Sequence, residues 1–318
     1  MPIALYRLPL LVLDEVIKAM EFRQLFILSL CSKRIHIDLK FLLRKSDKPI
    51  LDWDSDHTGG IHLDGGIILE VRQMPNIEPE GWRTDKLEGV MFQELFQKHD
   101  SMLNSYCENV QDGTRRLVEY ISDLFSAPIE FVSIYDRQHF WILDWVEKRQ
   151  GARTYEVYIE ERVTLTDDEF RHVLVELNPV RLHVNTKPSE NFRIENFDKK
   201  YDNFSLRYGD WLTGENLLTL DCIEMHIYRT TFTTTDINRF LRHVLIGGGA
   251  PRLTEFSALV EDGDVNRVLD GFLAPIPGQF DADNRIWDFG ATLTRGGKSE
   301  RVRVQCLGEE FCLTILDS

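Results

Sequence analysis

Residues 203–245 read NFSLRYGDWLTGENLLTLDCIEMHIYRTTFTTTDINRFLRHVL, and this stretch decides the fold. Strand-like runs begin near Asn203 and Ile223, and each is followed by a helix-like segment, Thr213 to Leu220 and Thr235 to Leu245. Threonine at the start of a helix is a favoured N-cap because its side-chain oxygen accepts a hydrogen bond from a free backbone N–H. The stretch therefore predicts the order strand, helix, strand, helix.

The same alternation extends in both directions along the chain. Further strand-like runs begin near Ile129, Tyr155, Val180 and Leu253, and further helix-like segments cover Phe140 to Lys148 and Asp167 to Leu177, the second with Thr166 as its predicted N-cap. Successive strands start roughly 20 to 30 residues apart, an interval typical of a stacked β-α repeat. No asparagine ladder or strict Leu-x-x-Leu-x-Leu is kept. We predict an irregular leucine-rich-repeat-like domain, with an ordinary α/β domain as the alternative.

The segments on either side of the repeat have other patterns. After residue 285, short apolar runs separated by glycines predict a small β-meander that closes the domain. Residues 47–85 are punctuated by glycine and proline, which predicts short strands and turns. From about Leu87 to Phe125 the spacing indicates helices, one with Val90, Leu95 and Leu103 and another with Leu117, Ile121 and Leu124. The fold class that we predict is α+β.

The first forty-odd residues indicate a compact helical unit. Leu13, Val16, Ile17 and Met20 have the spacing of one helical stripe, and a second helix is expected from about Gln24 to Lys33. This second helix is apolar nearly all round, whereas a surface helix buries only one stripe. A unit of about forty residues cannot bury so much apolar surface alone. Either a partner protein or the rest of the chain covers the excess.

Composition narrows the classes of partner. The 318 residues carry a formal net charge of −15, so phosphate backbones and anionic membrane faces would repel most of the surface. We expect no nucleic-acid partner and no membrane association. The five cysteines are odd in number, and none forms a Cys-x-x-Cys pair, which favours reduced thiols in the cytoplasm or nucleus. No metal, phosphate-binding or nucleophile motif is complete, so we expect no cofactor and no catalytic residues.

The N-terminal segment resembles the F-box motif. Leu8-Pro9 is followed by an apolar stretch from Val16 to Met20 and by Leu25–Arg34, a Leu-rich helix ending in Cys, Ser and Lys-Arg. The resemblance implies a three-helix F-box at residues 1–46 that binds the Skp-family adaptor subunit of a Skp–cullin–F-box (SCF) ubiquitin ligase. The adaptor-facing positions that it implies are Leu8, Pro9, Val16, Ile17, Leu25, Leu28, Cys31, Ser32 and Lys33.

A second resemblance lies at about 195–258. Asn203–Leu206, Asp210–Thr213, Asn216–Cys222 and Asp236–His243 are similar to the F-box-associated type 2 domain, which follows the F-box in many nematode proteins. The two resemblances imply a linking α+β segment at 47–125 and a substrate-binding domain at 126–318. They also imply a non-catalytic receptor that selects an unknown protein for ubiquitination. Because Glu21-Phe22 replaces the usual Asp-Pro of the F-box, a protein-binding scaffold without ligase coupling is the alternative.

One side of the predicted sheet offers candidate substrate-binding residues. Alternate residues of a strand face opposite sides, so Val157 and Ile159 are expected to point inward. The residues expected on the other side are Tyr158, Arg181, His183, Arg207, His226 and Tyr228. Tyrosine and arginine often anchor protein interfaces. The alternative is an ordinary solvated sheet face.

Overall fold

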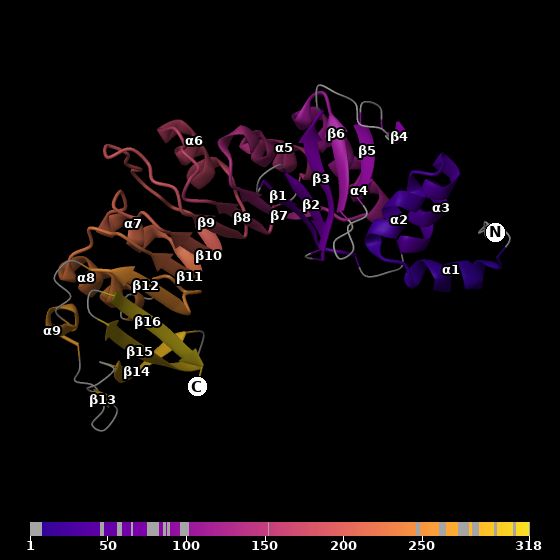
Figure 1. The fold of residues 1–318 in the computed structure, drawn as a ribbon. Helices are drawn as coiled ribbons and strands as arrows, with labels where there is room; N and C mark the ends of the chain where they lie inside the picture. Colours follow the sequence, from indigo (N-terminus) through magenta and orange to yellow (C-terminus); the bar gives the residue numbers. More distant parts are fainter. Residues whose placement is uncertain are drawn as a thin grey trace. The chain divides into compact units, whose positions relative to one another are not determined.

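The computed structural model describes residues 8–44, 48–55, 59–64, 66–74, 83–84, 87, 90–95, 102–151, 153–245, 249–260, 265–272, 280–281, 286–295, 298–307 and 310–317. The chain divides into two compact units, Met1–Gly151 and Ala152–Ser318. The predicted domain boundaries at 46 and 125 remain predictions. Helices and strands are mixed throughout the described chain (Figure 1), so the coarse prediction of a mixed helix-and-strand fold is confirmed.

Three helices open the first unit, namely α1 (Leu10–Lys18), α2 (Phe22–Ser29) and α3 (Lys33–Leu43). α2 begins with a capping box, because Gln24 accepts a hydrogen bond from the backbone N–H of Glu21. α2 ends earlier than expected, since Ser32 is the N-cap of α3 and accepts a 3.1 Å hydrogen bond from the N–H of Ile35. The single helix predicted from Gln24 to Lys33 is therefore wrong in its bounds.

A mixed sheet forms the rest of the first unit. Its strands are β1 (Leu51–Asp54), β2 (Gly60–Leu63), β3 (Gly66–Gln73), β4 (Arg83–Thr84), β5 (Val90–Leu95), β6 (Met102–Cys107) and β7 (Ile129–Ile134), in the order β7-β1-β2-β3-β6-β5-β4. β1 is parallel to β7, and β3 is parallel to β6. The helices are α4 (Val110–Phe125), the short 3-10 turn η2 (Arg137–His139) and α5 (Trp141–Gln150).

The helix predicted to contain Val90, Leu95 and Leu103 is wrong. Val90–Leu95 and Met102–Cys107 are antiparallel strands, with Val90 opposite Cys107 and Leu95 opposite Met102. Pairing with the neighbouring strand β3 buries Leu103, so tertiary contacts override a weak helical spacing. The other predicted helix is confirmed, because Leu117, Ile121 and Leu124 are all buried on α4.

Strands and helices alternate in the second unit. Its elements are β8 (Glu156–Ile159), α6 (Asp167–Arg171), the π-helical turn η3 (His172–Glu176), β9 (Arg181–Val184), β10 (Lys200–Leu206), α7 (Gly214–Thr219), β11 (Asp221–Ile227), α8 (Thr234–Leu245), β12 (Glu255–Leu259), α9 (Val265–Val268), β13 (Phe280–Asp281), β14 (Ile286–Arg295), β15 (Lys298–Leu307) and β16 (Glu310–Asp317). Strands β8 to β12 are parallel neighbours, and the antiparallel β14–β16 extend the sheet from β12. The predicted β-meander thus agrees with β14–β16.

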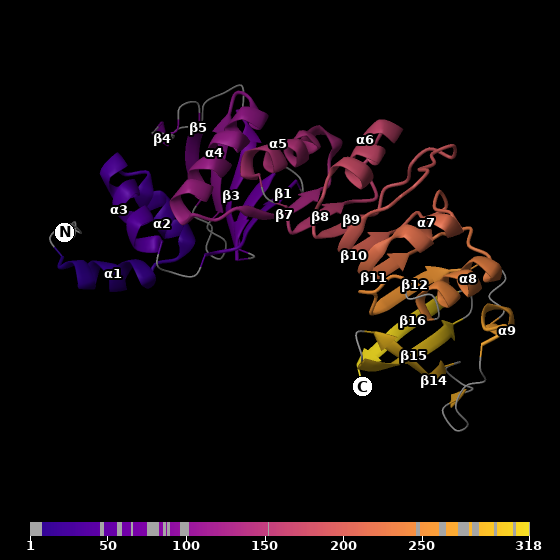
Figure 2. The same cartoon turned by 180° about the vertical axis from the view of Figure 1, so that it is seen from behind.

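The core of the second unit lies between the parallel strands and their helices. Figures 1 and 2 show α6, α7 and α8 on the same side of strands β8–β12. On that side Trp211 makes edge-on ring contacts with Phe170, Phe192 and Phe197, at centroid distances of 5.4 to 6.1 Å. Val157 and Ile159 are buried, as predicted.

Of the three helices of this unit with a predicted threonine N-cap, two have that threonine as their N-cap and one does not. Thr166 and Thr213 are N-caps with reciprocal side-chain bonds to Glu169 and Asn216. Thr235 is not an N-cap. α8 begins at Thr234, and the Thr233 hydroxyl oxygen instead accepts from the N–H of Asp236. Asp236 Oδ2 in turn accepts from the Thr233 N–H and hydroxyl, so a local capping box, which neither Thr234 nor Thr235 can form with Asp236, selects Thr233.

Candidate functional site

The side of the parallel sheet opposite α6, α7 and α8 carries polar side chains in register. Because β8, β9, β10, β11 and β12 are parallel and hydrogen-bonded in sequence, residues at matching positions lie side by side. We call the two resulting lines the polar rows. The first consists of Glu156, Arg181, Asn203, Glu224 and Glu255, and the second of Tyr158, His183, Ser205, His226 and Ser257.

The first polar row is held by contacts between neighbouring strands. Arg181 Nη1 lies 3.3 Å from Glu156 Oε2, and Asn203 Nδ2 donates a 2.5 Å hydrogen bond to Glu224 Oε2. Since a carboxylate only accepts, this bond fixes which way the Asn203 amide is turned. The Asn203 Oδ1 atom is then buried without a hydrogen-bond donor in the described part of the chain. Three carboxylates and one guanidinium give this row a negative formal charge.

Side-chain hydrogen bonds hold much of the second polar row. Its tyrosine and its two serines carry no charge. Asn185 Nδ2 donates to the Tyr158 hydroxyl at 2.9 Å, and His226 Nδ1 lies 2.9 Å from Ser257 Oγ. Burial lowers the pKa of His183, although the carboxylate of Glu156, 3.7 Å from its Nε2, opposes that shift. Burial thus favours the neutral form of the His183 imidazole. Such a surface can donate and accept hydrogen bonds.

The structure brings four of the six predicted substrate-binding residues into the rows. Tyr158, His183 and His226 share the second row, and Arg181 lies in the first. Arg207 and Tyr228 lie just beyond the carboxyl ends of β10 and β11. Arg207 Nη1 lies 2.7 Å from Glu161 Oε2, and the Tyr228 side chain is exposed. The role of all six residues in binding a substrate stays a prediction.

Sequence reasoning did not single out Asn203 or Glu224 as a site residue. Strand alternation could have found both, because Asn203 lies two residues before Ser205 on β10 and Glu224 two residues before His226 on β11. The bond between them depends on strand register, which the sequence pattern leaves undetermined.

The predicted adaptor-facing residues differ in exposure. Ile17 and Leu25 are buried, at 3% and 2% exposure. Leu8, Val16, Leu28 and Ser32 are half-buried, and Pro9, Cys31 and Lys33 are exposed. Ser32 already serves as the N-cap of α3.

Much of the apolar surface of α2 is covered by its own chain, although Leu28 stays half-buried. Phe22 makes an edge contact with Phe125 at 5.5 Å, and Phe26 makes edge contacts with Tyr120 and Phe92 at 5.9 Å each. α2 thus packs against α4 and β5, which was the second of the two possibilities left open by the sequence.

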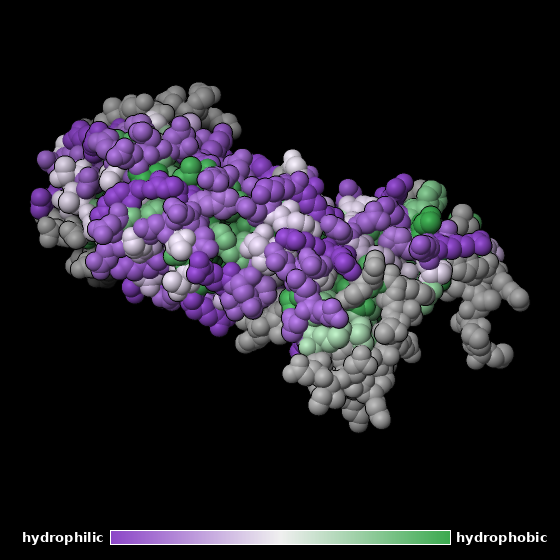
Figure 3. Space-filling model, turned by 90° about the horizontal axis from the view of Figure 1, so that it is seen from above, coloured by the Kyte–Doolittle hydropathy of each residue, from purple (hydrophilic) through white to green (hydrophobic). Residues whose placement is uncertain are grey.

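Exposed apolar side chains remain on the other two helices. Leu11 and Val12 on α1 are exposed, as are Ile37 and Phe41 on α3, the last two at 64% and 57%. Sequence reasoning missed these four, because they lie off the stripes that were used to identify the helices. Ile37 and Phe41 are four residues apart and therefore share one side of α3. Figure 3 shows that hydrophilic residues otherwise dominate the side of the surface seen from above.

In the part of the chain that the structure describes, no cluster of three or more His, Cys, Asp or Glu side chains could hold a metal ion. None of the helices there has the length and hydropathy that crossing a membrane requires.

Comparison with known proteins gives one match. Residues 191–258 match the family model described as F-box associated. This segment spans β10, α7, β11, α8 and most of β12, and it contributes Asn203, Ser205, Glu224, His226, Glu255 and Ser257 to the polar rows. No curated protein and no solved structure matches the chain. The F-box-associated resemblance is thereby confirmed, whereas the F-box at the N-terminus remains a prediction.

Proposed function

We propose that this protein is a substrate-recognition adaptor of an SCF ubiquitin ligase of the nematode F-box type. The observation that carries the proposal is the F-box-associated match at 191–258, which coincides with the β-α repeat and its polar rows. Proteins of this kind hold a target near the ubiquitin-carrying enzyme and catalyse no reaction themselves, so their effect is to raise effective concentration. The cytoplasm and nucleus, where ubiquitin ligases work, are the compartments that we propose.

The N-terminal helices supply the docking surface for the Skp-family adaptor subunit, which in turn joins the cullin. Ile37 and Phe41 lie on one side of α3 and are mostly exposed, while α2 is packed inward. Burying an apolar side chain of this size contributes about 2 kcal/mol. A partner helix covering both residues would gain about 4 kcal/mol from them, and contacts with Leu11 and Val12 of α1 would add to this. The exposed side chains of α1 and α3 therefore replace Leu25 as the centre of the proposed docking surface.

Capture of the full-length chain by the Skp-family adaptor subunit tests this surface. We expect Ile37→Asp to abolish capture, because it places a charge in the interface while leaving the chain folded. Lys148→Gln is the matched control, since it changes net charge by the same amount at a position with a 79% exposed side chain. Leu25→Asp is uninformative, because a charge at a 2% exposed position unfolds the helices.

Three outcomes of the capture experiment are distinct. Loss with Ile37→Asp and retention with Lys148→Gln would support the docking surface. Capture that persists in Ile37→Asp would place the interface elsewhere. Absence of capture by the unmodified chain would refute ligase coupling and favour the protein-binding scaffold.

The polar rows are the surface proposed to bind the target protein. Their mixture of carboxylates, one arginine, histidines and a tyrosine suits a polar protein segment. Affinity purification with the full-length chain and with Arg181→Ala and His226→Ala variants would test the assignment. A target that the original chain retains and both variants lose, with adaptor capture unchanged, is the expected result. Equal recovery of every co-purifying protein by all three chains would contradict it.

A further inference from the structure

A pocket of about 500 Å³ lies in the first unit. It is built where three parallel-running strands end: Val71–Gln73 close β3, Glu108 and Asn109 follow β6, and Gln138–Trp141 follow β7. β1 runs parallel to β7, and β3 runs parallel to β6. Because β2 is antiparallel to both β1 and β3, the carboxyl ends of β1, β3, β6 and β7 lie at the same edge of the sheet. In open α/β sheets this edge is where ligands bind.

The amino end of α4 supplies free hydrogen-bond donors to the pocket. Asn109 Oδ1 accepts from the N–H of Asp112 at 3.1 Å, which satisfies the third N–H of the helix. The first two, on Val110 and Gln111, have no partner in the described part of the chain. A helix of 16 residues also places partial positive charge at this end.

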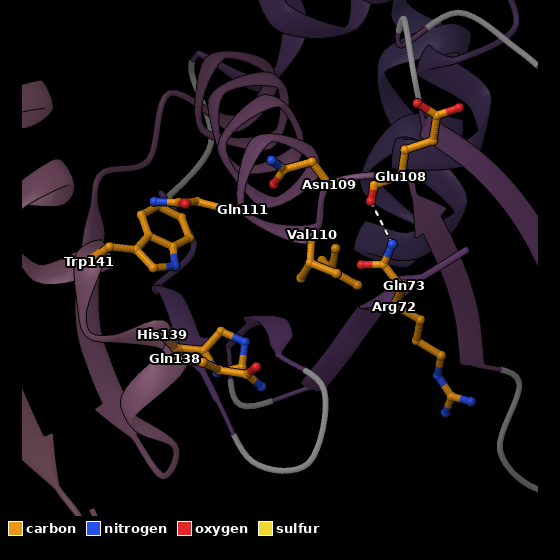
Figure 4. A pocket seen from close by; sticks show the side chains of 10 residues that line it. Arg72, Gln73, Glu108, Asn109, Val110, Gln111, Gln138, His139 and Trp141 are labelled. Carbon is orange, nitrogen blue, oxygen red and sulfur yellow. Dashed lines mark hydrogen bonds between the residues drawn. The ribbon is translucent and has the colours of Figure 1, made fainter. Parts of the chain in front are cut away.

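A buried histidine gives a second and independent indication. His139 is 4% exposed, and its Nδ1 atom has no hydrogen-bond partner in the part of the chain that the structure describes. Its Nε2 lies near Gly59, since a Cβ added there would be 4.0 Å from it. Figure 4 shows the rings of His139 and Trp141 on one side of the open space and Val110 on the other.

The charged side chains at the pocket are directed elsewhere. Arg72 is paired with Glu70, with its Nε 2.9 Å from the carboxylate, and Figure 4 shows its guanidinium turned away from the space beside Val110. The Glu108 carboxylate is also turned away, while the Glu108 carbonyl accepts a 2.5 Å hydrogen bond from Gln73 Nε2. The groups that line the space are therefore mainly neutral: backbone N–H groups, glutamine amides, an indole and an imidazole.

We propose that this pocket binds a small oxyanion, a phosphate or a carboxylate, on the N–H groups of Val110 and Gln111 with His139 and Trp141 as its wall. Oriented N–H groups at a helix start suit such a ligand without a positively charged side chain. Arg115, whose guanidinium lies 4.8 Å from the Trp141 ring centroid, is paired with Asp112 at 3.6 Å, so it adds no net charge there. The proposal adds a small-molecule site to a chain whose proposed function is protein recognition.

Titration of the full-length chain with inorganic phosphate, and separately with acetate, tests the proposal at constant ionic strength in chloride. The two arms distinguish a phosphate from a carboxylate ligand. The ¹⁵N resonances of labelled histidines report the binding, because the His139 ring lies in the pocket wall. We expect saturable displacement of the His139 signal by one of the two anions.

Gln111→Glu is the discriminating variant. A carboxylate there stabilises the start of α4 while repelling an anion, so the chain stays folded and the dissociation constant should rise about tenfold or more. Lys148→Gln has the same change in net charge outside the pocket and should bind as the original chain does. If neither anion moves the His139 signal saturably, or if Gln111→Glu binds as tightly as Lys148→Gln does, the proposal is wrong.

Discussion

Replacing Arg252 with alanine should release the amino ends of three neighbouring strands. Arg252 lies in the turn before β12. Its Nη2 donates at 2.8 Å to the carbonyl oxygens of Tyr201 and Asp221, at β10 and β11. Its Nη1 and Nε donate to the carboxylates of Asp202 and Asp221 at 2.7 and 3.1 Å. The Arg252 side chain is only 25% exposed, so water replaces these bonds incompletely.

The magnitude follows from these four hydrogen bonds. The two carbonyl bonds are each worth about 1 kcal/mol, as is typical of partly buried hydrogen bonds. The two carboxylate contacts are more exposed and contribute about 0.5 kcal/mol each. Because the contacts share one guanidinium they are not independent, and we expect Arg252→Ala to lower the free energy of unfolding by about 3 kcal/mol. Arg252→Lys should recover only part of this, since an ammonium group lacks the planar fork.

Urea denaturation followed by circular dichroism measures the effect, with Arg239→Ala as the matched control. Arg239 pairs with Glu215 in the same unit, but both side chains are more than half exposed, so its loss should cost less than about 1 kcal/mol. Raising the salt concentration to about 1 M should remove the Arg239→Ala effect and leave most of the Arg252→Ala effect. If Arg252→Ala destabilises the protein no more than Arg239→Ala, the inferred clamp does not exist.

Two further predictions concern the first unit. Gly113→Ala should destabilise the chain by about 1–3 kcal/mol, although alanine has the better helix propensity, because the new Cβ would lie 2.0 Å from the buried Cys107 Sγ. Thermal unfolding measures this loss of stability. Adding Cys107→Ala should recover part of it, since the smaller side chain removes the clash. Burial acts to raise the pKa of Asp123, but hydrogen bonds from Lys40 and His36 outweigh it and hold that pKa below its ordinary value. The resulting stability is present above the unfolded pKa of about 3.9 and is lost as pH falls through the folded value. Asp123→Asn should therefore lower stability near pH 6 by less than about 1 kcal/mol and match the original chain near pH 2; a constant difference at both pH values would contradict this.

Local patterns were sufficient for most elements of the second unit. Alternation of buried and exposed positions predicted the strand of Val157 and Ile159, and threonine caps predicted the starts of α6 and α7. These signals act over a few residues, so the sequence expresses them directly. At α8 the predicted cap Thr235 was wrong, because the local capping box of Thr233 with Asp236 was overlooked. The helical spacing failed at Val90–Leu95, where pairing with β6 decides the structure.

The sequence by itself determined the order of strands and helices in the β-α repeat, the likeness to the F-box-associated family, and the side of the sheet on which Tyr158, His183 and His226 lie. Only the tertiary structure decided that α2 packs on α4, that Asn203 bonds to Glu224, and that the strand ends around His139 enclose a pocket. The first group depends on periodicity within a few turns of chain. The second depends on register and on contacts between residues 20 to 100 positions apart, which no local pattern encodes.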